Sequence, residues 1–255
     1  MEKICQDLAA EHKVLDEIVS ALDDKEWETI TPFDGWTVKD EISHLGCFDY
    51  TATLSAKDPK DFHSHLETLL GKLKTADDFF EESLKPGQEK TPEALLSWWR
   101  EQRENLLNTL VKLDPKQRLP WYGPDMSAKS FATARLMETW AHGQDIVDTF
   151  KLNRKPTNRL RHIAHIGVTT FKWSYLNRGI DVPEASVYVE LKTDADDTWT
   201  WGDESSENSV SGPAEDFCLV VIRRRRINDT NLVIKGKVGQ EWMKIAQAFA
   251  GPVAD

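Results

Sequence analysis

The sequence predicts an α+β protein, with an antiparallel four-helix bundle at the N-terminus and a smaller α/β domain after it. Apolar side chains recur at helical spacing through most of residues 3–150, whereas alternation with a period of two first occurs at 186–191. Between the two regions, the segment 153–156 (Asn-Arg-Lys-Pro) interrupts the helical pattern. We therefore expect domains at 1–155 and 156–255, each large enough to bury its own core.

The first domain is expected to contain four long helices and one shorter helical piece. Thr37 followed by Asp40 is a capping-box pattern, Pro92 suits the first turn of a helix, and Ser127 suits a helix N-cap. The shorter piece covers about 61–83. Mixed connection lengths favour antiparallel packing of the long helices. The long helices are expected at about 3–24, 37–56, 92–113 and 128–150.

The second domain is expected to mix helices and strands. The segment 186–191 alternates apolar and polar side chains, as a half-buried strand does. Segments 198–201 and 208–211 are read as two further strands. Helices are expected at about 157–178, 214–225 and 240–250.

Charge and hydropathy limit the classes of partner. The formal net charge of −11 disfavours nucleic acids and anionic membranes, because phosphate groups select positive surfaces. No apolar run approaches the roughly 20 residues needed to span a bilayer, and residues 1–7 lack the apolar stretch of a signal peptide. We expect a cytoplasmic protein, monomeric or homodimeric, that binds a small molecule and neither nucleic acid nor membrane.

Glu138 and His142 form the first pair of residues that indicates chemistry. They lie four residues apart in the helix expected at 128–150, so their side chains project from one face, one turn apart. Apolar residues occur on both sides of this helix, which predicts that it is buried. Burying an isolated ionised carboxylate costs on the order of tens of kcal/mol in the idealised limit, unless the charge is paired or bound to a metal.

His44 is the candidate for the third member of this group. It lies at the edge of the apolar face of its own helix, where an imidazole can reach the bundle axis. Two histidines and one carboxylate suit zinc, or another first-row divalent ion such as Ni²⁺, and leave coordination positions open. Taken alone, the spacing of Glu138 and His142 favours a surface pair or a core hydrogen bond over a pair of metal ligands.

Two segments carry a resemblance to a known family. Residues 36–45 (Trp-Thr-Val-Lys-Asp-Glu-Ile-Ser-His-Leu) resemble the Gly-Trp-Thr-Val-x-Asp-x-x-x-His-Leu signature of the DinB-like and mycothiol-dependent maleylpyruvate isomerase superfamily. Residues 138–145 (Glu-Thr-Trp-Ala-His-Gly-Gln-Asp) are similar to its second ligand-bearing helix. Segments 212–217 and 242–252 look like an uncharacterised metal-binding branch of the same superfamily.

The resemblance implies both an architecture and a chemistry. It implies a DinB-like four-helix bundle that holds one metal through His44, Glu138 and His142, followed by a sterol-carrier-protein-like α/β domain. It also implies a low-molecular-weight thiol of the mycothiol or bacillithiol type as cofactor. A metal-coordinated thiol is deprotonated near neutral pH, and the thiolate is the nucleophile.

Several residues near these motifs are candidates for supporting roles. Asp145 lies close to His142 in sequence and is either an acceptor that holds its ring or a surface residue. Trp121 and Tyr122 precede the ligand helix and are either walls of a cofactor pocket or ordinary packing residues. His162 and His165 have ligand-like spacing, but two polar positions on a partly solvated helix explain them better.

Four consecutive arginines occur at 223–226. They are most simply read as a solvated helix end that complements the negative end of the helix dipole. Related isomerases use an arginine of the C-terminal domain to bind a carboxylate of the substrate or thiol, which a guanidinium fork does well. Arg225 and Arg226 are the candidates for that catalytic role.

The function that these observations favour is metal-dependent transfer of a thiol to a small electrophile, or isomerisation of that electrophile, in a cavity between the two domains. Two alternatives stay open. The first is metal-assisted hydrolysis, which needs a proton acceptor close to a bound water. The second is a non-catalytic metal-binding or small-molecule-binding protein, whose metal would have a closed coordination shell.

Overall fold

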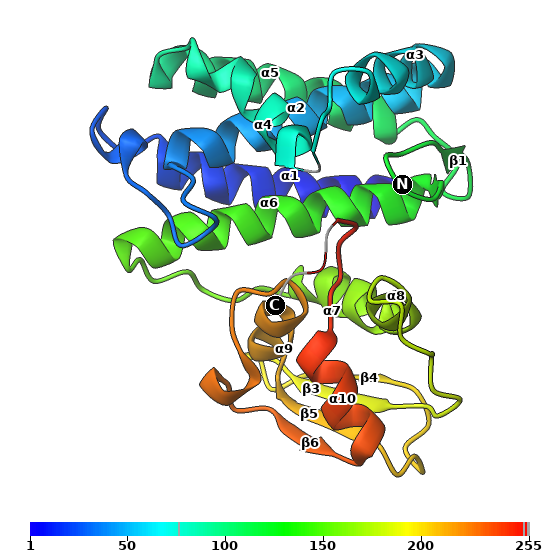
Figure 1. Cartoon of the computed structure of the whole chain (residues 1–255). Helices are drawn as coiled ribbons and strands as arrows, with labels where there is room; N and C mark the ends of the chain where they lie inside the picture. The colour runs from blue at the N-terminus through cyan, green and yellow to red at the C-terminus, as the bar shows by residue number, and fades with distance from the viewer. Residues whose placement is uncertain (76, 252, 254–255) are drawn as a thin grey trace. The chain divides into compact units, whose positions relative to one another are not determined.

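The structure is a computed structural model that describes residues 1–75, 77–251 and 253. The chain divides into two compact units, Met1–Asn153 and Arg154–Asp255. The first unit is almost entirely helical, and the second combines helices with a four-stranded sheet (Figure 1). The protein is therefore of the α+β class, as predicted. No helix in the described part of the chain is both long enough and apolar enough to cross a bilayer.

Four long helices form the framework of the first unit. Helix α2 packs against α5 and α6, and α1 also packs against α5 and α6 (Figure 1). Leu15, Ile42, Leu45, Leu95 and Trp99 are completely buried where these helices meet. The four helices are α1 (Glu2–Val19), α2 (Val38–Lys57), α5 (Pro92–Leu110) and α6 (Ala128–Phe150).

Local sequence signals explain where several of these helices begin. The capping box of α2 is confirmed, because the Thr37 hydroxyl accepts from Asp40 N while the Asp40 side chain accepts from Thr37 N. The side chain of Ser127 accepts from Ser130 N at the start of α6, also as predicted. Helices α1 and α5 end at Val19 and Leu110, a few residues earlier than expected.

Two shorter helices, α3 (Pro59–Leu70) and α4 (Asp77–Gln88), pack on α2. The prediction of one helical piece over 61–83 was wrong, because α3 ends at Leu70 and α4 starts only at Asp77. Thr75 and Asp78 exchange hydrogen bonds, and this reciprocal pattern begins a new helix.

The first unit is completed by a short 3-10 helix and a two-stranded ribbon. The 3-10 helix spans Glu26–Glu28 and buries Trp27. The strands β1 (Arg118–Leu119) and β2 (Met126–Ser127) are antiparallel and precede α6 directly. The sequence did not predict these three elements, because each covers only two or three residues.

The second unit contains a sheet with the strand order β4-β3-β5-β6. Strands β3 and β5 are parallel, whereas β4 and β6 are antiparallel to their neighbours. Val189, Leu191 and Val210 are fully buried on one face of the sheet. The strands are β3 (Tyr188–Lys192), β4 (Thr198–Trp201), β5 (Ser209–Pro213) and β6 (Val233–Lys235), of which only β6 was not predicted.

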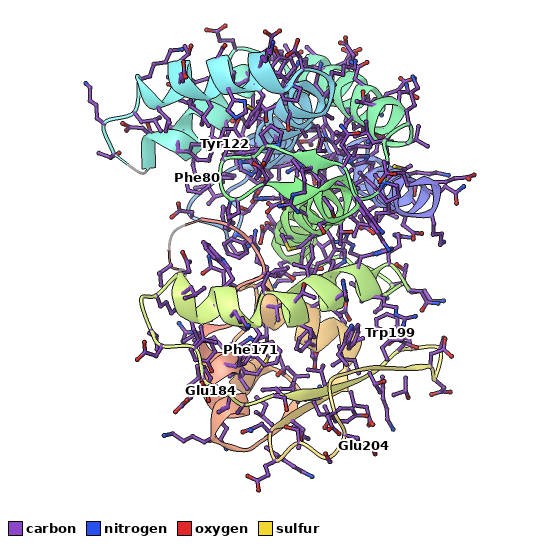
Figure 2. The ribbon with its side chains drawn as sticks, turned by 90° about the vertical axis from the view of Figure 1, so that its right-hand side faces the viewer. Phe80, Tyr122, Phe171, Glu184, Trp199 and Glu204 are labelled. Carbon is purple, nitrogen blue, oxygen red and sulfur yellow. The ribbon has the colours of Figure 1, made fainter. Side chains whose placement is uncertain are left out.

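The helices of the second unit are shorter than the sequence suggested. The helix expected at 157–178 is two helices, α7 (Leu160–Thr169) and α8 (Phe171–Leu176). Helix α9 (Ala214–Val221) ends before the arginines, and α10 spans Lys237–Ile245. The ring of Phe171 in α8, labelled in Figure 2, lies 5.3 Å from that of Trp242 in α10.

Candidate metal centre

The side chains of His44, Glu138 and His142 converge inside the first unit. One ligand atom from each of the three lies within 4.8 Å of the other two. The ring centroids of His44 and His142 are 4.6 Å apart, and His142 Nε2 lies 3.3 Å from Glu138 Oε2. Both histidines are buried, at 5% and 3% exposure. Helices α2 and α6 therefore bring together the three residues named from the sequence.

Glu41 orients the ring of His142. Its Oε2 atom lies 2.5 Å from His142 Nδ1, and its Oε1 atom accepts a hydrogen bond of 2.7 Å from the Thr31 hydroxyl. Glu41 is completely buried. Burial raises the pKa of its carboxyl group, and the neighbouring His142 opposes that rise. The sequence reading missed Glu41, although a carboxylate between Val38, Ile42 and Leu45 should have indicated a buried partner.

Asp145 does not take the role suggested for it. Its Oδ2 atom lies 3.9 Å from His142 Nδ1, which is beyond hydrogen-bond distance. It is also buried, at 3% exposure, so the alternative of a surface residue was wrong as well. Glu41 occupies the position of acceptor instead, because α2 passes closer to that nitrogen.

Ser83 orients the ring of His44. The Ser83 hydroxyl donates to Phe80 O at 2.6 Å, so its oxygen accepts from His44 Nδ1 at 3.0 Å. Ser43 on α2 holds helix α4, which carries Ser83, in place, because the Ser43 hydroxyl accepts a hydrogen bond from Gly87 N at 2.8 Å. A Cβ atom on Gly87 would lie 2.5 Å from Ser43 Cβ, so glycine permits this close approach of α4 to α2.

These contacts determine which ring nitrogens are available. In both histidines Nδ1 carries the proton that the neighbour accepts, so the Nε2 lone pair remains for a ligand. Two donors about 2.0–2.2 Å from a tetrahedral ion lie about 3.4 Å apart. The 3.3 Å between His142 Nε2 and Glu138 Oε2 agrees with that separation. The residues therefore fit a zinc-like ion.

A second group of potential ligands, formed by Glu41, His142 and Asp145, also lies close together. Its geometry fits an ion less well. The 2.5 Å between His142 Nδ1 and Glu41 Oε2 is a hydrogen-bond distance, whereas two donors on one ion lie about 3 Å apart or more. We interpret Glu41 as a support for His142 and not as a ligand.

Aromatic rings cover the two histidines. Trp36 stacks on His142 with centroids 5.9 Å apart and also lies 5.0 Å from His44. Phe33 meets His142 edge to face at 5.4 Å. The turn between them uses positive φ angles at Asp34 and Gly35, of 49° and 74°. This turn places Trp36 over the candidate ligands, where its ring reduces access of water.

A buried ion pair connects the two helices that carry the ligands. Arg135 Nε on α6 donates to Asp49 Oδ1 on α2 at 3.0 Å, and Trp99 Nε1 donates to the other carboxylate oxygen at 3.3 Å. Asp49 and Arg135 are 0% and 3% exposed. They lie five and three residues from His44 and Glu138, so the pair helps to set the separation of the ligand helices.

Trp121 and Tyr122 lie in an aromatic cluster beside α3 and α4. Trp121 stacks on Phe62 at 5.9 Å, and Tyr122 lies edge to face with Phe48 at 5.6 Å. Phe48 in turn packs on His44, with ring centroids 4.5 Å apart. The two residues are therefore neighbours of the candidate ligands through Phe48.

The four arginines lie beyond α9 and not within it, which corrects the expected helix at 214–225. Arg223 has a φ of 63° and donates to Lys244 O at 2.9 Å, which turns the chain away from the helix axis. Arg225 is partly buried and donates to Arg224 O, and Arg226 is exposed. Arg225 and Arg226 belong to the second unit.

His162 and His165 lie in α7. His165 is exposed and accepts a hydrogen bond of 3.3 Å from Trp201 Nε1. In the described part of the chain, neither histidine belongs to a group of three potential metal ligands. This agrees with the interpretation of the pair as polar residues of a partly solvated helix.

Comparison with known proteins gives relatives over almost the whole chain. Two uncharacterised proteins of Mycobacterium tuberculosis, from strains CDC 1551 / Oshkosh and ATCC 25618 / H37Rv, are each 38% identical over 246 residues. The match covers 96% of this chain and 95% of each relative.

Solved structures show a similar fold. The crystal structure of the mycothiol-dependent maleylpyruvate isomerase has a TM-score of 0.60 and 14% identity, and covers 91% of this chain and 92% of that one. The structure of a histidine-to-alanine variant of that isomerase has a TM-score of 0.59, with the same identity and coverage.

The family comparison covers the part of the chain that contains the candidate ligands. The domain described as "Mycothiol maleylpyruvate isomerase N-terminal domain" matches residues 8–147, which include His44, Glu138 and His142. This match extends over more than half of the 255 residues. The chain thus belongs to the family of the mycothiol maleylpyruvate isomerase N-terminal domain.

Proposed function

We propose that this protein is a metal-dependent enzyme that uses a low-molecular-weight thiol. His44, Glu138 and His142 would hold one divalent ion, zinc in the first place. The reaction would be transfer of the thiol to a small electrophile, or isomerisation of that electrophile. The observation that carries the proposal is the convergence of three donor atoms within 4.8 Å, with both Nδ1 atoms already bonded to neighbours.

Three protein ligands leave a coordination position open, as catalytic zinc sites require. An ion bound there would lower the pKa of a coordinated thiol, so that the thiolate is present near neutral pH. The chain's own residues prepare this position. Glu41 and Ser83 accept hydrogen bonds from Nδ1 of His142 and of His44, which directs Nε2 of each ring toward the ion. Such acceptors typically raise metal affinity. Trp36 and Phe33 exclude water, which strengthens electrostatic interactions at the site.

The identity of the thiol is carried over from the relatives. The solved isomerase is named as mycothiol-dependent, and the matching family domain bears the same cofactor in its description. On that basis we propose that this chain also uses a thiol of the mycothiol or bacillithiol type. The substrate class is a small electrophilic molecule.

The proposal also assigns a domain type to each of the two parts of the chain. The long helices α1, α2, α5 and α6 support a DinB-like antiparallel four-helix bundle over 1–155, and the mixed sheet supports a sterol-carrier-protein-like domain over 156–255. Binding of a substrate carboxylate is assigned to Arg225 or Arg226, because a guanidinium fork suits that group. Trp121 and Tyr122 are assigned to the aromatic surroundings of the cofactor.

Hydrolysis is the weaker candidate. It needs a proton acceptor near a water on the Nε2 side of His142. The buried carboxylates Glu41 and Asp145 both approach His142 from the Nδ1 side. Neither of them faces the open coordination position.

The test is to load the purified protein with zinc and to measure consumption of mycothiol or bacillithiol with electrophiles such as maleylpyruvate. We expect consumption that requires the metal and that is lost in His44→Ala but kept in His63→Ala, a control at an exposed histidine. If no thiol is consumed while zinc still binds tightly, the thiol-dependent function is wrong.

A further inference from the structure

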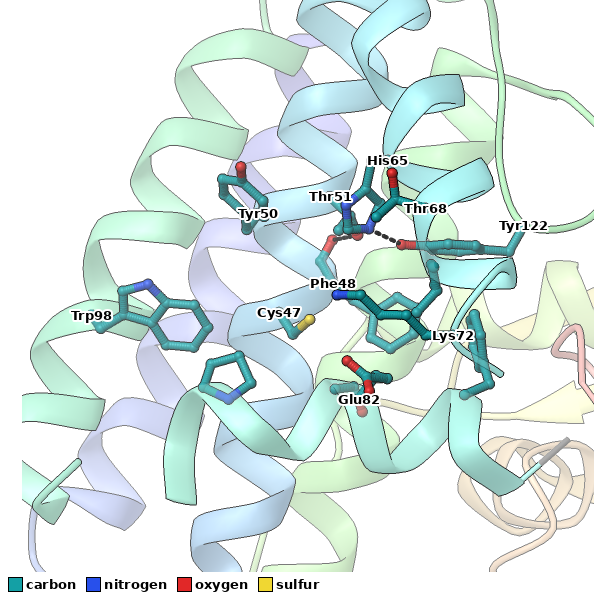
Figure 3. A pocket seen from close by; sticks show the side chains of 14 residues that line it. Cys47, Phe48, Tyr50, Thr51, His65, Thr68, Lys72, Glu82, Trp98 and Tyr122 are labelled. Carbon is teal, nitrogen blue, oxygen red and sulfur yellow. Dashed lines mark hydrogen bonds between the residues drawn. The ribbon is translucent and has the colours of Figure 1, made fainter. Parts of the chain in front are cut away.

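A separate cavity of about 350 Å³ lies in the first unit, beside the candidate metal centre. Its walls come from α2, α3, α4 and α5 and from the loop before α6 (Figure 3). This volume falls within the range of about 300–1,000 Å³ that is usual for small-molecule sites. His44, Glu138 and His142 do not line it, so it is distinct from the metal site.

The walls of the cavity are mainly aromatic and apolar. Phe48, Phe79, Trp98 and Tyr122 present rings, and Leu69 adds an aliphatic surface. The ring centroids of Phe79 and Tyr122 lie 5.0 Å apart, so these rings form a continuous wall. Aromatic rings packed edge to face in this way favour a planar apolar ligand.

Most of the polar groups in the cavity are neutral near pH 7. Burial raises the pKa of Cys47 to about 11 and that of Tyr122 to about 12, so both remain protonated. Burial and the charge of Lys72 lower the pKa of His65, whose Nε2 lies 3.4 Å from the Tyr122 hydroxyl. These groups can form hydrogen bonds with a ligand but contribute no charge.

Two charged side chains remain, and one of them is already paired. Glu82 forms an ion pair with Lys85. Lys72 is exposed at the mouth of the cavity and makes no ion pair with any residue that the structure describes. In Figure 3 the side chain of Lys72 points toward the side of the cavity that carries Cys47. The mouth of the cavity therefore offers one cation to a ligand.

The cavity shares a wall with the metal centre. Ser83 lines the cavity, and its hydroxyl accepts the hydrogen bond from His44 Nδ1 at 3.0 Å. Phe48 also lines it and packs on His44 with ring centroids 4.5 Å apart. A molecule in the cavity would touch both residues that position His44.

We propose that this cavity is an effector site for a small aromatic carboxylate. The ring lies between the aromatic walls, the carboxylate pairs with Lys72 at the mouth, and the occupant changes metal affinity through Ser83 and Phe48. Binding of the carboxylate in this cavity is independent of the proposed enzymatic function. The effect on metal affinity rests on the metal site of that proposed function.

Binding is tested first on the metal-free full chain, by calorimetric titration with 1-naphthoate. We expect one molecule per chain with a Kd below about 1 mM. Affinity should fall about tenfold or more for the neutral analogue 1-naphthalenemethanol, for Lys72→Met and for Thr68→Trp, which narrows the cavity. Lys60→Met and Glu67→Trp, at exposed positions of α3 outside the cavity, should bind as the wild type does. Absence of saturable binding would overturn the proposal even if the enzymatic function is correct. The same holds if Lys72→Met and Thr68→Trp bind 1-naphthoate as tightly as the wild type does.

The effector role is tested by measuring zinc affinity with and without 1-naphthoate. We expect a change of about fivefold or more, and the same factor for naphthoate affinity between zinc-loaded and metal-free protein, because such coupling is reciprocal. At a naphthoate concentration that just saturates the wild type, the change should be clearly smaller in Lys72→Met. A change of equal size in this variant would mean that the carboxylate coordinates zinc directly and would refute the effector role. Unchanged zinc affinity at saturating naphthoate would refute the effector role.

Discussion

The Nδ1 atom of His142 on α6 lies 2.5 Å from Oε2 of Glu41 on α2, in a contact that joins residues 101 positions apart. It fixes the tautomer of His142 so that Nε2 faces Glu138. Glu41 itself is held by Thr31. Glu41 is therefore a second carboxylate at the candidate metal centre, one that contacts the ligand His142 and not the ion. Its effect on metal affinity can be measured.

Replacing Glu41 by glutamine should lower zinc affinity by about 10- to 100-fold, because the amide is a weaker acceptor for His142 Nδ1 than the carboxylate. Competition with a chromogenic chelator measures this change. Glu93→Gln, at an exposed position in the first turn of α5, serves as the control and should leave the affinity unchanged. Equal affinity in Glu41→Gln and the wild type would show that Glu41 does not support the metal site.

Replacing Arg135 by methionine should destabilise the fold by about 3–5 kcal/mol, because Asp49 would remain as a buried charge without its partner. Urea unfolding measures this loss. The matched control is Arg100→Met, which breaks a half-exposed ion pair with Asp16 and should cost about 0–1 kcal/mol. The double variant Arg135→Met/Asp49→Leu should recover much of the lost stability. Similar losses in the two single variants would contradict a structural role for the buried pair.

Protonation of His12 should make the protein less stable in mild acid. Burial, reinforced by the charges of Arg103 and Arg135, places the pKa of His12 well below 6.5 in the folded state. The unfolded chain therefore takes up the proton first as pH falls below about 6.5, and stability is lost by up to about 1.4 kcal/mol per pH unit.

This pH dependence can be assigned to His12 by comparison with His12→Leu. Free energies of unfolding are measured between about pH 7.5 and about pH 5.5, and the variant should lose less stability over that interval. Burial raises the pKa of the adjacent Asp49, which acts in the opposite direction in both proteins. A pH dependence that is the same in His12→Leu and the wild type would rule out His12 as its source.

Strong local signals allowed several elements to be predicted from the sequence. Helix α6 spans Ala128–Phe150 as expected, because Ser127 caps its start and apolar residues surround the helix. The break between α3 and α4 had a local signal too, since Thr75 and Asp78 form a capping pattern that was overlooked. The end of α9 before Arg223 had no comparable signal.

The supports of the candidate site depend on packing between distant segments. His44 and His142 could be named from their helices, but their partners Ser83 and Glu41 are 39 and 101 residues away from them. The pairing of Asp49 with Arg135 likewise depends on how α2 packs against α6. Helical periodicity shows which face of a helix is buried, but it does not show which residue of another helix it meets.

Zinc binding at equilibrium tests the central claim most directly. Dialysis of the purified protein against zinc, followed by elemental analysis, should give one zinc per chain for the wild type and for His63→Ala. The variants His44→Ala and His142→Ala should retain much less than one. A wild type that takes up no zinc or other first-row divalent ion, or triad variants that bind as much as the wild type, would contradict a metal centre at His44, Glu138 and His142.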